Sequence, residues 1–86
     1  MYRIVVHKRA ANYLRGLPAP DKERLKQAIA ALAADPFGVS DVKPMSWQWA
    51  GYYRVRQGNK RILFWVDRES RIVYVDHIGP RGDVYK

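Results

Sequence analysis

The sequence predicts an α+β fold in which a helical hairpin packs on one face of a small, mostly antiparallel sheet. Apolar residues recur at helical spacing in two adjacent stretches between residues 10 and 33, and a proline-rich turn separates them. A run of β-branched and aromatic residues then extends from residue 52 to residue 78. The expected order is β-α-α-β-β-β within a single domain, residues 1–86, because 86 residues are too few for two domains of ordinary size.

The two expected helices each have one apolar stripe. In the first helix four residues share a face: Ala10, Tyr13, Leu14 and Leu17. Neither His7 nor Lys8 is a preferred N-cap residue, so this helix is expected to be poorly capped. Pro20 can serve as the first residue of the second helix, whose stripe spans 25–33 and which ends before Pro36. A hairpin of this kind needs a sheet to cover its stripes.

Strands are expected at residues 2–6, 52–57, 60–66 and 71–78, where β-branched and aromatic residues concentrate. Trp47 and Trp49 alternate with polar residues before Gly51, which favours a further short strand at about residues 45–49. Gly58 and Asn59 separate two of the runs and are typical of a two-residue β-hairpin loop.

The hairpin fixes which side chains share a face, because strand partners point to the same side of a sheet. Gln57 then faces Lys60, and Arg56 faces Arg61. One face carries apolar residues suited to the helices: Tyr53, Val55, Ile62, Phe64 and Val66. The other face carries three arginines beside aromatic residues: Tyr52, Arg54, Arg56, Arg61, Leu63 and Trp65.

The net charge of +8 indicates a polyanionic partner, and it comes from 16 basic and 8 acidic residues spread evenly along the chain. Residues 54–61 hold four basic groups and no acid. Arg56 and Arg61 directly opposed would repel each other, and an anion lying across this face would relieve that repulsion. Arginine forks fit phosphate oxygens, so we expect a phosphate site here. The alternative is that the arginines extend into solvent and only cover the sheet with their stems.

Several chemistries are disfavoured by the sequence. The chain has no cysteine, and it shows no histidine–acid metal spacing, nucleophile elbow or phosphate-binding glycine loop, so no metal or cofactor is expected. It also lacks an apolar run long enough for a membrane span and an apolar signal-peptide core, so an intracellular protein without a membrane partner is expected. His77 is an acid–base candidate, because imidazole titrates nearest neutral pH, although a lone strand histidine is more often structural.

The stretches 53–64 and 78–85 resemble the RelE/ParE toxin superfamily of bacterial type II toxin–antitoxin systems. The pattern Tyr-Arg-x-Arg-x-Gly-x-x-Arg from residue 53 carries the resemblance, with an arginine and a tyrosine near the C-terminus. The resemblance favours the RelE-like branch. It implies a cytoplasmic toxin that enters the 70S ribosome and cuts mRNA without a metal, through attack of the ribose 2′-hydroxyl on the adjacent phosphate. It also implies a cognate antitoxin, whose binding segment is expected to be acidic and apolar.

The resemblance also implies roles for residues at matching positions. The catalytic set is Arg54, Arg61, Arg81 and Tyr85, in which Arg61 stabilises the transition state and Arg81 lies near the leaving group. Arg56 matches a basic position of the family and is expected to bind RNA. The charge of Lys60 and the aromatic rings beside the arginines add Lys60, Tyr52 and Trp65 to the expected RNA-binding set, and His77 is an additional acid–base candidate. Many relatives carry a histidine or lysine where this chain has Pro80. Arginine stays protonated and is a poor base, so Arg81 and Tyr85 are hypothesised to share the proton transfers.

Two alternatives remain at this point. A ParE-like member would have the same fold and would inhibit DNA gyrase without cutting RNA. A basic nucleic-acid-binding module would have neither activity. Basic residues away from the arginine face, such as Lys22, Lys26 and Arg68, are expected to dock on ribosomal RNA.

Overall fold

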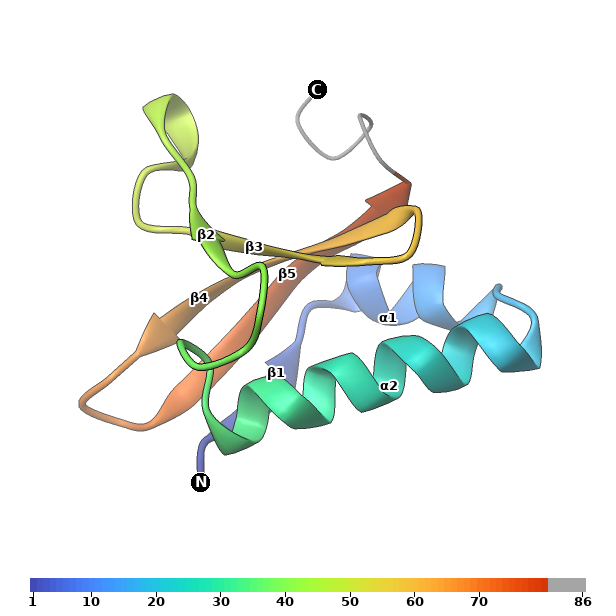
Figure 1. Ribbon diagram of the computed structural model, residues 1–86, viewed down its shortest axis with the longest axis horizontal. Helices are drawn as coiled ribbons and strands as arrows, with labels where there is room; N and C mark the ends of the chain where they lie inside the picture. Colours follow the sequence, from blue (N-terminus) through green and yellow to red (C-terminus); the bar gives the residue numbers. More distant parts are fainter. Residues whose placement is uncertain (81–86) are drawn as a thin grey trace.

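The structure is a computed structural model that describes residues 1–80. The elements are β1 (Arg3–Val6), α1 (Lys8–Arg15), α2 (Ala19–Ala34), β2 (Lys43–Pro44), the short 3-10 helix η1 (Trp47–Trp49), β3 (Tyr53–Gln57), β4 (Lys60–Asp67) and β5 (Ile72–Pro80). One five-stranded sheet has the order β1-β5-β4-β3-β2, in which β1 runs parallel to β5 and the other neighbours are antiparallel. Both helices cover the same side of the sheet (Figure 1), so the predicted α+β class is confirmed.

The core lies between the helices and the apolar face that the hairpin register predicts. Its buried residues come from both helices and from the three strands β3 to β5: Ala10, Leu25, Ile29, Leu32, Val55, Ile62, Phe64, Val73, Val75 and Ile78. Tyr53 and Val66 are half-buried and pack against this cluster, as expected for their face. Within residues 1–80, neither helix combines the length and hydropathy that crossing a membrane requires.

The helix boundaries differ from the prediction at their N-termini. The expectation of a poorly capped first helix is wrong, because His7 adopts an extended backbone and its Nδ1 accepts a hydrogen bond of 3.1 Å from the Arg9 amide. The second helix begins at Ala19, one residue before the expected Pro20, with Pro18 as its N-cap. Pro20 still lies in the first turn, where its missing N–H has no helical partner to lose.

The expected strand at residues 45–49 is wrong. Pairing with β3 covers only Lys43 and Pro44, and the chain then turns through the 3-10 helix at Trp47–Trp49. Trp47 has a φ of 60°, which is incompatible with an extended strand. Backbone hydrogen bonds from Met45 to Tyr52 (2.8 Å) and from Ala50 to Trp47 (3.0 Å) close the resulting loop.

The predicted hairpin register is confirmed along β3 and β4, from Gln57 opposite Lys60 to Tyr53 opposite Phe64. Gly58 has a φ of 61°, the conformation that a two-residue hairpin loop requires at its first position. A register shift between Leu63 and Phe64 interrupts the pairing of β4 with β5: Leu63 lies opposite His77, and Phe64 lies opposite Val75.

Candidate functional site

The sheet face opposite the helices gathers four cations from β2, β3 and β4. Two rows of strand partners cross it. The first row is Lys43, Arg54, Leu63 and His77, and the second is Arg56, Arg61 and Gly79. Because strand partners share a face, four cations meet on this surface, which we call the basic face: Lys43, Arg54, Arg56 and Arg61. The structure thus brings together the three arginines that the sequence placed on one face.

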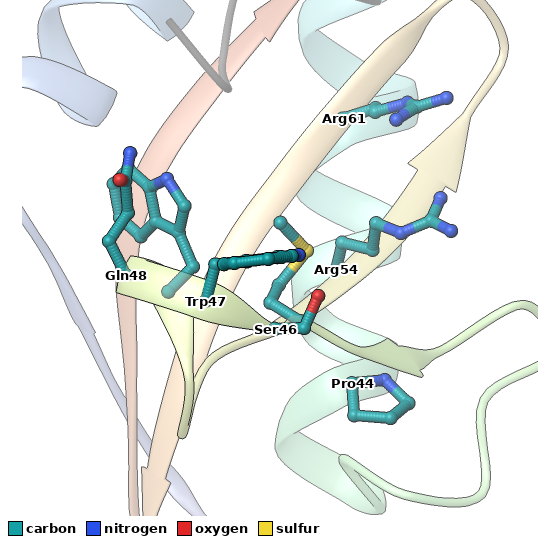
Figure 2. Close-up of a pocket in the computed structure, with 8 residues that line it drawn as sticks. Pro44, Ser46, Trp47, Gln48, Arg54 and Arg61 are labelled. Carbon is teal, nitrogen blue, oxygen red and sulfur yellow. The ribbon is translucent and has the colours of Figure 1, made fainter.

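A pocket of about 470 Å³ opens on the basic face (Figure 2). Arg54 and Arg61 line it from the sheet, and the loop before β3 supplies the opposite wall: Pro44, Met45, Ser46, Trp47, Gln48 and Trp49. A smaller hollow of about 130 Å³ lies beside it and is lined by Asp41, Lys43, Arg54 and Arg56. Arg54 therefore borders both spaces, and an anion in the pocket would lie against two guanidinium groups.

Two arginines of the basic face, Arg54 and Arg56, have little compensation from the carboxylates of residues 1–80. The salt bridges within residues 1–80 involve three other basic side chains, Arg9, Arg24 and Lys60, and the imidazole of His77 lies beside Asp76. Neither Arg54 nor Arg56 forms a salt bridge with a carboxylate of that part of the chain, although Asp41 lines the smaller hollow with them. Uncompensated cations at a hollow raise the local positive potential and concentrate anions there.

Trp49 anchors the loop that walls the pocket. Its ring makes edge contacts with Tyr52 and His77, at centroid distances of 5.2 and 5.8 Å. Leu63, the strand partner of His77, is fully buried although it lies on the face away from the helices. The loop is therefore packed on the sheet at this end and holds its pocket-facing residues in a fixed position.

His77 lies in the same row as Arg54 but outside the pocket lining. Its Nδ1 is 2.9 Å from Asp76 Oδ2, and the other oxygen of that carboxylate is 3.5 Å from the Arg9 guanidinium. This arrangement orients the ring against Trp49 and leaves its role in proton transfer a prediction.

Other predicted site residues lie elsewhere. Lys60 shares a face with Gln57 on the helix side, is only 15% exposed, and directs its Nζ to Asn59 (3.0 Å) and Asp21 (3.8 Å). Trp65 is on the open face but stacks on Tyr74, with ring centroids 4.3 Å apart. It lines a separate pocket of about 240 Å³ near β1.

The remaining predicted residues divide between the loop and the C-terminus. Tyr52 precedes β3 and packs against Trp49. Arg81 and Tyr85 lie outside the described residues. Sequence reasoning missed Lys43, Met45, Trp47 and Gln48 as site residues. The available signal is the pair of tryptophans before Gly51, whose alternation with polar residues also fits a strand.

Comparison with known proteins gives full-length similarities. No protein-family profile matches the chain. A candidate toxin named RelE1 from Methanocaldococcus jannaschii is 29% identical over 87 residues, covering 99% of this chain and 96% of that protein. The RelE–RelB complex from Pyrococcus horikoshii contains a chain that is 25% identical with a TM-score of 0.82, over 95% of this chain and 97% of that one.

The RelBE2 toxin–antitoxin complex from Mycobacterium tuberculosis gives the same result. Its matching chain is 25% identical with a TM-score of 0.80, over 93% of this chain and 98% of that one. Sequence and fold thus agree over nearly the whole length, and the chain is similar to RelE toxins throughout, as the resemblance to the RelE/ParE toxin superfamily implies.

Proposed function

We propose that this protein is the toxin of a type II toxin–antitoxin pair and an endoribonuclease that cuts mRNA in the ribosome. The observation that carries the proposal is the pocket of the basic face, where Arg54 and Arg61 from adjacent strands face an aromatic loop. A phosphate group fits between two guanidinium forks, and an aromatic wall suits the neighbouring bases. Such an enzyme would act in the cytoplasm, where translating ribosomes are found.

The proposed reaction is cleavage by the ribose 2′-hydroxyl. Its oxygen bonds to the adjacent phosphorus while the bond from phosphorus to the 5′-oxygen breaks. One proton leaves the 2′-hydroxyl and one is added to the 5′-oxygen, which gives a cyclic phosphate and a free 5′-hydroxyl. Negative charge builds on the phosphoryl oxygens in the transition state, and Arg54 and Arg61 would stabilise it there.

The proton transfers need other groups, because guanidinium stays protonated in proteins and supplies charge rather than a base. The proposal assigns them to Tyr85, with the charge of Arg81 stabilising the leaving oxygen and with His77 as an additional acid–base candidate. Proton transfer by a positioned side chain contributes about 10²- to 10⁴-fold to a rate. Tyr85→Phe should therefore lower the cleavage rate by a larger factor than it lowers the affinity for RNA.

A protein antitoxin is part of the proposal. Two solved relatives were crystallised as RelE–RelB and RelBE2 complexes. The basic face and the net charge of +8 would suit a partner segment that carries acidic residues.

The proposal is tested with purified ribosomes programmed with a defined mRNA. Addition of the protein should produce cuts within codons, with cyclic phosphate ends. Alanine at Arg54 or Arg61 should lower the rate by about 10²- to 10³-fold, the usual effect of losing one transition-state donor. Lys8→Ala is the matched control, because Lys8 is an exposed cation of α1 on the helix side.

The result that contradicts the proposal is intact mRNA at saturating protein. Inhibition of gyrase supercoiling in a parallel assay would then support the ParE-like alternative. Activity in neither assay would support a basic binding module.

A further inference from the structure

Trp47 is an exposed aromatic residue in an unfavourable backbone conformation. It is 91% exposed, although tryptophan is usually largely buried in folded proteins. Its φ of 60° lies in the left-handed region, which bulky side chains rarely adopt. Backbone strain of this kind persists where the surrounding structure imposes it, and it concentrates at functional sites.

The surrounding loop imposes this conformation through its own contacts. Hydrogen bonds from Trp49 to Ser46 (3.1 Å), from Ala50 to Trp47 (3.0 Å) and from Tyr52 to Trp49 (3.0 Å) fix the backbone. Trp49 holds the loop on the sheet through its ring contacts with Tyr52 and His77. Within residues 1–80, Trp47 makes no such aromatic contact, so the two tryptophans have different roles.

The Trp47 side chain is positioned beside the two arginines of the pocket. It lines the same space as Arg54 and Arg61, and Figure 2 shows its ring extending from the loop toward Arg54. An exposed indole presents a flat face on which a base can stack, while a guanidinium fork binds phosphate oxygens. In a nucleotide the base and the phosphate are joined through one sugar, so a single nucleotide can contact the indole and the guanidinium together.

We propose that Trp47 is a base-stacking residue of this site, on which a nucleobase of the RNA lies while Arg54 and Arg61 hold the neighbouring phosphate. The inference rests on the proposed function and adds a base-binding residue to it. Every base has a stacking face, so Trp47 accepts all four bases, with purines favoured because their rings cover more of the indole. Gln48 lines the same pocket and offers an amide that can hydrogen-bond a base edge.

Stacking and phosphate binding respond differently to salt, which gives the test. The probe is a short fluorescent RNA with 2′-O-methyl groups, which block cleavage. Trp47→Ala should weaken its binding by between about 5-fold and 150-fold, the range measured for loss of one base–aromatic stack. The dependence of affinity on salt should stay that of the parent. Arg54→Ala should instead reduce the salt slope by about 0.7, the amount expected for one lost phosphate contact.

Two further variants separate stacking from a structural effect. Trp47→Phe should restore most of the affinity, because the smaller ring still stacks. Phe37→Ala is the matched control, because Phe37 is another exposed aromatic, at 36% exposure, and lies outside the pocket lining. It should bind as the parent does. Circular dichroism confirms that every variant is folded before binding is measured.

The inference is overturned if Trp47→Ala binds as tightly as the parent, if its salt slope falls as that of Arg54→Ala does, or if Trp47→Phe fails to restore binding. If the parent cuts ribosome-bound mRNA in the same experiments, the proposed function stands without the stacking role of Trp47. A parent that neither binds nor cuts RNA overturns both.

Discussion

Replacing Arg56 with glutamate should stabilise the fold and weaken RNA binding. Arg56 and Arg61 are direct strand partners, so their Cβ atoms lie about 4.5–5.5 Å apart. Glutamate at position 56 replaces a repulsion with an attraction. Arg56 is exposed, so we expect a gain of about 0.5–1 kcal/mol in the free energy of unfolding after allowing for solvent screening. For a domain of this size that raises the melting temperature by about 2–8 °C.

Thermal unfolding followed by circular dichroism measures the stability, and fluorescence anisotropy with a short RNA measures the binding. The gain in melting temperature should shrink as salt is added, because salt screens both the repulsion and the attraction. RNA affinity should fall, since a cation of the basic face becomes an anion. Lys26→Glu is the matched control: it makes the same change in net charge at an exposed position of α2.

Two results would refute the reasoning about Arg56. A lower melting temperature for Arg56→Glu would mean that the opposed pair does not destabilise the hairpin. Equal shifts for Arg56→Glu and Lys26→Glu would mean that net charge, rather than the pairing with Arg61, sets the stability.

Three further predictions concern the core, the helix side of the hairpin and the loop. Phe64→Ala should lower the free energy of unfolding by about 3–5 kcal/mol, because Phe64 is fully buried. Urea unfolding measures this loss, and a loss below about 1 kcal/mol would contradict the described core. Lys60→Gln should bind RNA with an affinity within about twofold of that of the parent, because the Lys60 amine is directed to Asp21. A loss of about tenfold, measured by fluorescence anisotropy, would show that Lys60 belongs to the site. Trp47→Gly should change the unfolding free energy by between zero and a gain of about 1 kcal/mol, because glycine relieves the left-handed strain but loses more entropy on folding. It should also weaken RNA binding, and a destabilised Trp47→Gly would show that the indole supports the loop.

The basic face could be predicted from the sequence because its geometry is local. Gly58 and Asn59 close the hairpin in two residues, and a fixed loop length fixes every strand pair that follows. The alternation of Val55 and Ile62 with the arginines then decides which face turns to the helices. The same register places Lys60 opposite Gln57, on the helix side, so its position was also predictable. Only the charge of Lys60 and its place in the chain favour a role in the site, and the register outweighs both.

The pocket wall could not be predicted because distant contacts decide it. The spacing of Trp47 and Trp49, with one polar residue between them, fits a strand as well as it fits the observed turn. The conformation depends on the packing of Trp49 against His77, 28 positions further along the chain, and on the end of pairing between β2 and β3 at Pro44. The cap of α1 is a similar case, since the amide of His7 bonds to the Val75 carbonyl of β5 at 2.8 Å and so fixes where the helix begins.

The unfavourable features of this molecule gather at one place, which is an argument for function there. Two opposed arginines and a strained, exposed tryptophan all border the basic face. Selection for stability alone would remove each of them with a single substitution. A bound polyanion would offset the repulsion and cover the indole, and any ligand that binds only the folded state stabilises it by mass action. At 100 times its dissociation constant this amounts to about 2.7 kcal/mol, more than the expected gain from Arg56→Glu. RNA that occupies the pocket should therefore raise the melting temperature of the parent more than that of Arg56→Glu, so that ligand binding reverses the order of stability of the two proteins.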